Sequence, residues 1–351
     1  MGRVLTTASF LALGAGSALA GGIERSNQSV APLFKSGNYM EFSLGSFQPS
    51  VSGTAIPALG GANSGDMAGD YVTYSFAYKR ALSDQLDMAV IVDQPIGADV
   101  SYPTGTGYPF TGATAEVKST AVTGLLRYRF PSNFSAYGGL RIQSVDASLN
   151  LPTGGGPYAL AVDRQTDLGY VLGVAYEKPE IALRVSLTYN SAITHTFTDN
   201  SANPFDVEIP QSVHLEFQTG IAKDTLLFGS VKWREWTRFN ISPPEYPANP
   251  LADGKSNVLT YTLGLGRKFN ENWSGAVVLG YEPKAGVPVG NLAPTDGYTS
   301  IALAATYKVD NVEITGAVSY YDIGDATTTS VGSQFKGNDG IGVGIRVGYT
   351  F

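Results

Sequence analysis

The C-terminal stretch IGVGIRVGYTF, residues 341–351, decides the fold of this chain. Large apolar side chains stand at every odd position from Ile341 to Phe351, and Gly, Arg or Thr stands at every even position. Successive side chains of a β-strand point to opposite faces, so this strand has one apolar face and one small, polar face. The chain also stops on an aromatic residue. The stretch therefore predicts a closing strand whose outer face contacts lipid and whose inner face contacts a polar lumen.

The same alternation recurs along the chain and predicts fourteen strands. The clearest of them cover residues 168–176, 181–189, 259–265, 273–281, 301–307 and 312–320. Six short connections lie near residues 83–84, 131–133, 177–179, 223–224, 270–271 and 310. Seven longer ones, rich in Gly, Pro and Asn, cover 53–69, 101–114, 150–158, 199–206, 241–255, 284–297 and 324–337. Short turns at one end and long loops at the other are typical of bacterial outer-membrane barrels. We therefore predict an all-β fold, a transmembrane antiparallel β-barrel of fourteen strands formed by residues 39–351. A soluble β-sandwich also alternates, but it does not need so many strands.

The N-terminus carries a secretory signal. Arg3 precedes an apolar run from Val4 to Leu13, and the small-x-small sequence Ala18-Leu19-Ala20 follows. We expect residues 1–20 to be removed as a signal peptide, because the apolar run is too short to span a bilayer.

Residues 21–38 show no alternation and precede the first predicted strand. We expect them to fold into the lumen as a short plug, of which Ile23, Val30, Leu33 and Phe34 would line the ligand path. The alternative is a disordered periplasmic tail.

The composition excludes several classes of function. The chain has no cysteine, so thiol chemistry and disulfides are excluded, and with only two histidines a His-rich metal site is improbable. The formal net charge of −7 argues against nucleic acid as a partner. His214 lies near Glu216, but no serine stands at a motif distance from it. We predict that the protein is not an enzyme and binds no cofactor or metal. Charged residues are only 15% of the chain, against about 25% in typical domains, which indicates a lumen for hydrophobic cargo.

Three segments together resemble the FadL family of outer-membrane transporters for long-chain fatty acids and related hydrophobic compounds. They are VEIPQSVHLEFQTGIAKDTLLFGSVKWREWTRF (207–239), the stretch 259–309, and the terminal strand ending on Phe351. The resemblance rests on strand order and spacing and covers most of the mature chain. It implies a fourteen-stranded barrel with an N-terminal plug, which takes up hydrophobic molecules, long-chain fatty acids first among them. The plug turn of the family reads Asn-Pro-Ala, and the matching site here reads Ala31-Pro32-Leu33.

Candidate binding residues lie in the loops and in the lumen. The predicted outer loops are unusually apolar, which suggests a landing surface for hydrophobic compounds. An alternative is a small packed core under the loops. If the cargo is a carboxylate, inward-facing cations should bind its head group through charge-assisted hydrogen bonds. The residues that we assign to ligand binding are Ile56, Leu59, Val287, Val289, Arg141, Lys232 and Lys255.

The third predicted strand contains a break. After Leu86–Val92 the sequence reads Asp93-Gln94-Pro95-Ile96-Gly97, and Pro and Gly in a strand mark bulges or interruptions. An interruption within a membrane barrel survives only where it lines a cavity. The FadL family has an inward kink in this strand. We therefore predict that Pro95, Ile96 and Gly97 form a lateral exit into the bilayer. The alternative is a simple bulge near the outer rim.

Two other functions remain open. A general diffusion porin predicts a charged, open lumen, whereas a structural or adhesive barrel predicts activity in the outer loops alone. We expect a monomer in the bacterial outer membrane whose partners are membrane lipid, a hydrophobic small molecule and the barrel-assembly machinery, which would read Phe351.

Overall fold

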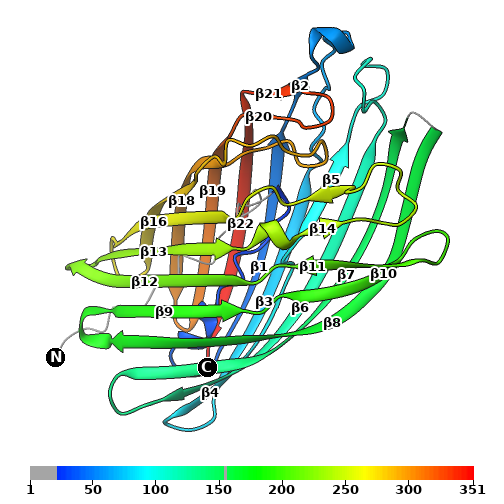
Figure 1. Cartoon of the computed structure of the whole chain (residues 1–351). Coiled ribbons are helices and arrows are strands. Elements are labelled where there is room, and N and C mark those ends of the chain that lie inside the picture. Colours follow the sequence, from blue (N-terminus) through cyan, green and yellow to red (C-terminus); the bar gives the residue numbers. More distant parts are fainter. Residues whose placement is uncertain (1–21, 154–155) are drawn as a thin grey trace.

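The computed structural model describes residues 22–153 and 156–351. The predicted signal peptide, residues 1–20, lies outside the described residues. One large antiparallel sheet curls round and closes on itself (Figure 1). Among the described residues, none of the helices is both long and apolar enough to cross a membrane.

The barrel wall follows the order of the chain. Its strands are β1 (Tyr39–Ser50), β3 (Tyr71–Ala81), β4 (Leu86–Asp93), β5 (Gly97–Ser101), β6 (Thr114–Arg129), β7 (Phe134–Thr153), β8 (Gly156–Lys178), β9 (Leu183–Asn190), β12 (Ser212–Ala222), β13 (Thr225–Arg234), β16 (Val258–Lys268), β17 (Trp273–Glu282), β18 (Tyr298–Val309), β19 (Val312–Ile323) and β22 (Asn338–Thr350). The first and last of these, β1 and β22, pair from Tyr39↔Thr350 to Ser50↔Asp339 and close the wall. Because β4 and β5 both pair with β6, they share one place in the wall. Over the described residues the predicted count of fourteen strands is thus confirmed.

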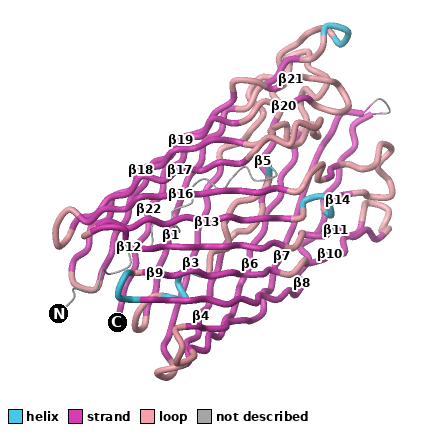
Figure 2. Tube along the Cα trace, turned by 60° about the vertical axis from the view of Figure 1, so that its left-hand side comes forward, coloured by secondary structure: helices cyan, strands magenta, loops and turns pink. Residues whose placement is uncertain are grey.

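Shorter elements lie outside the order of the wall strands, and most of them are found at the outer end of the barrel, whereas η5 lies in the short turn between β8 and β9 (Figure 2). The strands are β2 (Gly53–Thr54), β10 (Ile193–Thr198), β11 (Pro204–Ile209), β14 (Asn240–Ile241), β15 (Ala252–Asp253), β20 (Ala326–Thr327) and β21 (Gln334–Phe335). The 3₁₀ turns are η3 (Ala31–Phe34), η4 (Pro57–Leu59), η5 (Pro179–Ile181) and η6 (Trp236–Arg238). Of these, β10 and β11 form a separate hairpin, and η3 belongs to the segment that precedes the wall.

The two faces of the wall differ as the alternation predicts. In β22, Ile341, Val343 and Ile345 are 50%, 51% and 47% exposed, whereas Arg346 is 2% exposed. The same outward apolar pattern continues on the other wall strands. An exposed apolar surface that surrounds the whole barrel is far larger than the patches of soluble proteins. The surface is therefore one that contacts lipid, with polar groups turned to the lumen.

One predicted loop is wrong. We expected residues 150–158 to form a long connection because the stretch is rich in Gly and Pro. Instead β7 and β8 stay paired as far as Thr153↔Gly156. The extended pairing of β7 and β8 is stabilised by Leu151, which is only 2% exposed and packs into a cluster formed with the outer loops. Its burial and the continued backbone pairing outweigh the weak strand preference of Gly and Pro.

We expect deletion of Phe351 to lower the yield of folded barrel in the outer membrane. The Phe351 amide donates a hydrogen bond to the Asn38 carbonyl (3.0 Å), and its ring lies 5.8 Å from that of Tyr349. Deletion removes both contacts where the barrel closes, together with the terminal aromatic residue that the assembly machinery would read. The heat-modifiable, folded fraction on unheated gels measures the effect. Phe269→Ala, which truncates another exposed aromatic, is the matched control. Equal folded yields for the deletion and the control would contradict this expectation.

Candidate functional site

An apolar cavity of about 190 Å³ lies in the outer part of the barrel. The wall strands β5 to β8, the β10–β11 hairpin, η6 and the loop 284–297 all contribute to it. Among the side chains that line it are Ile96, Val117, Leu160, Phe197, Phe205, Val207, Trp236 and Phe239. Its surface is predominantly apolar, as expected for a site that takes up a hydrophobic molecule.

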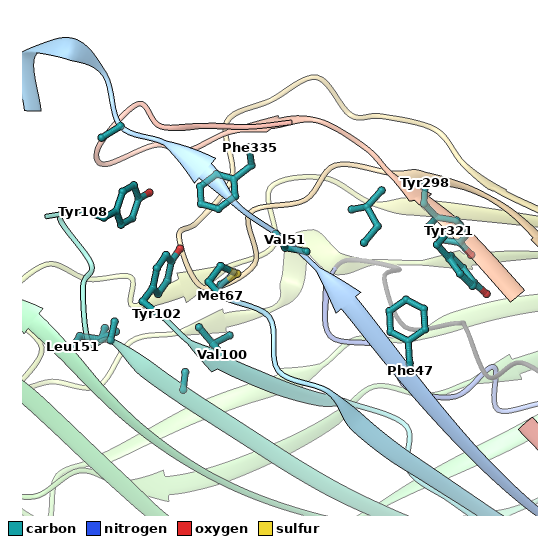
Figure 3. Packing of buried hydrophobic residues seen from close by; sticks show 14 residues of the cluster. Phe47, Val51, Met67, Val100, Tyr102, Tyr108, Leu151, Tyr298, Tyr321 and Phe335 are labelled. Carbon is teal, nitrogen blue, oxygen red and sulfur yellow. The ribbon is translucent and has the colours of Figure 1, made fainter. Parts of the chain in front are cut away.

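The outer loops form a packed core of their own beside the cavity. Figure 3 shows Val51, Met67, Tyr102, Tyr108 and Phe335, which belong to one buried cluster. The Tyr102 hydroxyl also donates a hydrogen bond to a backbone carbonyl of the loop 284–297 (2.6 Å). The loops therefore support one another over the outer end of the barrel. A packed core under the loops and an apolar cavity are present together.

The structure separates the predicted loop residues into two groups. Val287, Val289 and Lys255 line the cavity. Ile56 and Leu59 lie at the turn η4, are 38% and 43% exposed, and are not part of the cavity lining. In Figure 1 this turn is the tip that extends furthest from the barrel.

The three predicted ligand cations already have partners within the chain. Lys232 donates a hydrogen bond to Glu24 Oε2 (2.7 Å), and Lys255 pairs with Asp253 (2.7 Å). Arg141 donates hydrogen bonds to Thr123 Oγ1 and Asn190 Oδ1, both at 2.9 Å. Only Lys255 of the three lines the apolar cavity. Sequence reasoning could not find the Lys232–Glu24 pair, because the two residues stand 208 residues apart.

Residues 22–34, which we call the inner segment, run through the lumen. Glu24 is 1% exposed and lies between Lys232 Nζ and Arg234 Nε, each at 2.7 Å. Further along, Ser29 Oγ donates to Glu216 Oε1 (2.5 Å), and Ser26 donates a short hydrogen bond to Asp93. Opposite charges paired in a buried lumen hold a segment firmly, because separating them leaves charge uncompensated.

Below the cavity, the inner segment packs against one side of the barrel wall. Val30 and Leu33, 1% and 0% exposed, pack against inward-facing apolar side chains of β3, β4, β6, β7 and β8. Phe34 follows, with its ring edge against Tyr137 at 5.6 Å. Ile23 lines the cavity above this layer, so all four residues predicted for a plug lie inside the barrel. Beyond this layer, a space of about 560 Å³ borders Phe34, Arg127 and Arg184.

The third wall strand is interrupted where the sequence predicts a break. β4 ends at Asp93 and β5 begins at Gly97. Between them the chain turns inward and pairs with the inner segment: Arg25 N donates to Pro95 O (3.0 Å), and Gly97 N donates to Ile23 O (2.8 Å). These bonds satisfy backbone groups that would otherwise be unpaired within the membrane.

The interruption leaves an edge of β3 open. The pairing of β3 with β4 stops at Phe76↔Val92. Within the described part of the chain, Tyr71–Ser75 of β3 pair with no strand on that side. Only the side chain of Gln94 reaches across, where its Oε1 accepts a hydrogen bond from Tyr74 N (2.9 Å). The gap ends above Tyr71, where Gly69 N donates to Asp99 O (2.8 Å) and Ala68 forms a β-bridge with Val100.

A second, smaller cavity of about 100 Å³ lies at this open edge, between the inner segment and the wall. Arg25, Asp93 and Gln94 line it, whereas Ile23 lines the large apolar cavity. Residues 23–25 thus form the partition between the two cavities. Glu24, at the centre of that partition, also forms an isolated β-bridge with Ile96.

Comparison with solved structures shows which fold this chain shares. Neither a family model nor a curated protein matches the sequence. Solved structures do match. A Pseudomonas aeruginosa FadL homologue aligns over 92% of both chains, with a TM-score of 0.73 and 13% identity. The chain has the FadL-type barrel fold.

Two further structures agree. The Pseudomonas putida toluene transporter TodX aligns over 95% of this chain and 98% of its own, with a TM-score of 0.65 and 13% identity. The Ralstonia pickettii toluene transporter TbuX aligns over 90% of both chains, with a TM-score of 0.61 and 11% identity. The FadL-type fold together with the apolar outer surface is that of a β-barrel of the bacterial outer membrane.

Sequence reasoning missed the contribution of the β10–β11 hairpin and of η6 to the apolar cavity. Residues 199–206 were expected to be a plain outer loop. The sequence does contain a strand pattern here, because Phe205, Val207 and Ile209 alternate with polar residues. In the structure these residues pair with β10. It was weak because the run is short and begins at Pro204.

Proposed function

We propose that this barrel takes up neutral hydrophobic molecules, about the size of one aromatic ring, across the outer membrane. The observation that carries the proposal is the apolar cavity of about 190 Å³. An apolar cavity of about 150 Å³ is enough to bind benzene. Two of the structural neighbours are named as toluene transporters, which supports the same class of cargo.

Long-chain fatty acids fit the lumen less well. A carboxylate head group needs a cation that is free to bind it. Lys255, the predicted cation that lines the cavity, is paired with Asp253, and Lys232 below it is paired with Glu24. A fatty acid would have to displace one of these acids. Competition of laurate with toluene for the protein measures this directly, and we expect laurate to compete weakly.

The route that we propose leaves the barrel sideways. We propose that the layer of Val30 and Leu33 blocks the straight path to the periplasm, and their burial against the wall supports this. From the large cavity a molecule that passes residues 23–25 reaches the smaller cavity beside the open edge of β3. The interruption at Pro95, Ile96 and Gly97 then serves as a lateral exit into lipid. This route keeps a hydrophobic molecule out of the aqueous periplasmic mouth.

Ala147→Trp should strongly slow the uptake of labelled toluene by cells that express the protein. Ala147 lines the cavity, and an indole placed there fills much of a space of about 190 Å³. Ala136→Trp, on the same strand but beyond the cavity lining, is the matched control. Its uptake should match that of the wild type. Unimpaired uptake by a well-folded Ala147→Trp barrel would overturn the proposed function.

A further inference from the structure

Arg184 is a buried cation without a bonded partner at the periplasmic end of the lumen. It belongs to β9, is 5% exposed and lines the space of about 560 Å³ beyond the layer of Val30 and Leu33. Within the residues that the structure describes, its guanidinium forms no ion pair and donates no hydrogen bond. A buried charge normally has a partner, because an unpaired one loses its water without compensation.

The guanidinium of Arg184 can be reached from this space. Its Nε is fully buried, whereas Nη1 and Nη2, which also lack a partner among the described residues, keep some accessible surface. Two neighbouring N–H donors of a guanidinium match the two oxygens of a carboxylate. Arg184 therefore offers a ready end-on binding site for such a group.

The ring of Phe34 fixes the position of this guanidinium. The Cζ atom of Arg184 lies 4.8 Å from the ring centre, and that of Arg127 lies 4.4 Å from the same centre. Arg127 is already engaged, because its Nε donates to Ser135 Oγ (3.0 Å) and its terminal nitrogens pair with Asp87 (4.0 Å) and Glu177. Of the two arginines that contact Phe34, only Arg184 is free to bind a ligand.

The other charges around the space leave room for one negative charge. Most are paired within the chain, as Lys35–Glu313 (3.3 Å), Lys308–Glu313 (3.6 Å), Arg129–Asp87 (3.4 Å) and Arg127–Glu177. Glu216, on the neighbouring strand β12, accepts a hydrogen bond from Ser29 (2.5 Å) and forms no ion pair with Arg184. Asp310, Glu177 and Glu313 also line the space and would repel a dianion. The charge distribution thus favours a monoanion.

The space lies at the periplasmic end of the barrel and is separate from the apolar cavity. Three of the short turns border it, through Asn133, Pro179 and Asp310. It shares no lining residue with the apolar cavity. A ligand of Arg184 therefore enters from the periplasm. Phe34, Pro179 and Leu183 give the space apolar walls beside its charges.

We propose that Arg184 binds the carboxylate of a small aromatic monoanion from the periplasm, with Nη1 and Nη2 donating to its two oxygens. The ring of the ligand contacts the apolar side chains of Phe34, Pro179 and Leu183, which an inorganic anion would leave uncovered. This site is distinct from the one that the proposed function uses, so the two stand or fall separately.

Benzoate and benzyl alcohol are suitable probes, because they share size and shape and only benzoate is charged at neutral pH. Inorganic phosphate is the third probe. Binding to the purified barrel in one nonionic detergent is measured by titration calorimetry, with protein-free micelles as the blank, for the wild type, Arg184→Gln and Arg267→Gln. Arg267 is an exposed residue of β16 outside the lining of the space, so its variant is a control with the same loss of charge.

The affinity for benzoate should fall about ten- to a hundredfold in Arg184→Gln, as expected for the loss of hydrogen bonds to a charged group. It should not change in Arg267→Gln. The wild type should bind benzoate more tightly than benzyl alcohol or phosphate, and this comparison does not depend on how a variant folds. Toluene should not displace benzoate, because the two molecules occupy separate spaces.

A folded Arg184→Gln barrel that binds benzoate as tightly as the wild type would overturn the inference. A wild type that binds no benzoate, or binds benzyl alcohol or phosphate at least as tightly, would overturn it as well. Displacement of benzoate by toluene would locate the carboxylate in the apolar cavity and so contradict the site. None of these results affects toluene uptake, which tests the proposed function on its own.

Discussion

Deleting residues 22–34 should turn a closed barrel into an ion-conducting pore. The deletion removes Val30 and Leu33, which we propose close the lumen, and it removes Glu24 from between Lys232 and Arg234. Water then fills the lumen and hydrates the released cations, so the wall need not collapse. Charges that face a water-filled lumen are tolerated in a membrane barrel.

The pore should prefer anions. Lys232, Arg234, Arg141 and Arg184 then outnumber the buried acids Asp93, Glu216 and Glu282. Stepwise conductance and the reversal potential under a salt gradient in planar bilayers measure both effects. Deleting residues 58–62 at the exposed loop tip is the control and should leave the bilayer as silent as the wild type does. A deletion of 22–34 that folds and still fails to conduct would show that the inner segment is not what closes the lumen.

The wall was predictable because its signal is local. A strand with one face in lipid alternates every second residue, and that period can be read without knowing which strands are neighbours. The same holds for the interruption of the third wall strand, which Pro95 and Gly97 indicate within a few residues of sequence. The lumen is different. Arg234 and Gln28 meet across 206 residues, and no local pattern marks such a contact.

The candidate site was predictable only in part for the same reason. Val287 and Val289 belong to a loop whose apolar composition stands out, and they do line the cavity. Ile56 and Leu59 are equally apolar, yet the turn η4 carries them away from the barrel. Composition identifies apolar loops, but the packing of the loops against one another decides which of them face the cavity.

The second large effect concerns the partition at residues 23–25. Locking Glu24 to Ile96 with a disulfide should block uptake, because the proposed route requires this partition to move. The two hydrogen bonds that flank the bridge, from Arg25 N and from Gly97 N, make Glu24 and Ile96 a non-hydrogen-bonded pair. The Cα atoms of such a pair are about 4.5 Å apart, within the range that a disulfide spans, about 4.4–6.8 Å.

The chain suits this design because it has no cysteine of its own. Glu24→Cys also removes the partner of Lys232, so the oxidised and reduced forms of the same double variant must be compared. The loss of the carboxylate is then common to both states. Each single cysteine variant, treated with the same oxidant, controls for damage by the reagent.

Toluene uptake by cells that express the Glu24→Cys/Ile96→Cys barrel, measured before and after reduction, tests the proposed lateral route most directly. We expect the oxidised protein to be folded and inactive, and reduction to restore uptake. If the oxidised barrel takes up toluene as fast as the reduced one, hydrophobic cargo does not pass between the inner segment and the interrupted strand, and the proposed lateral route is wrong.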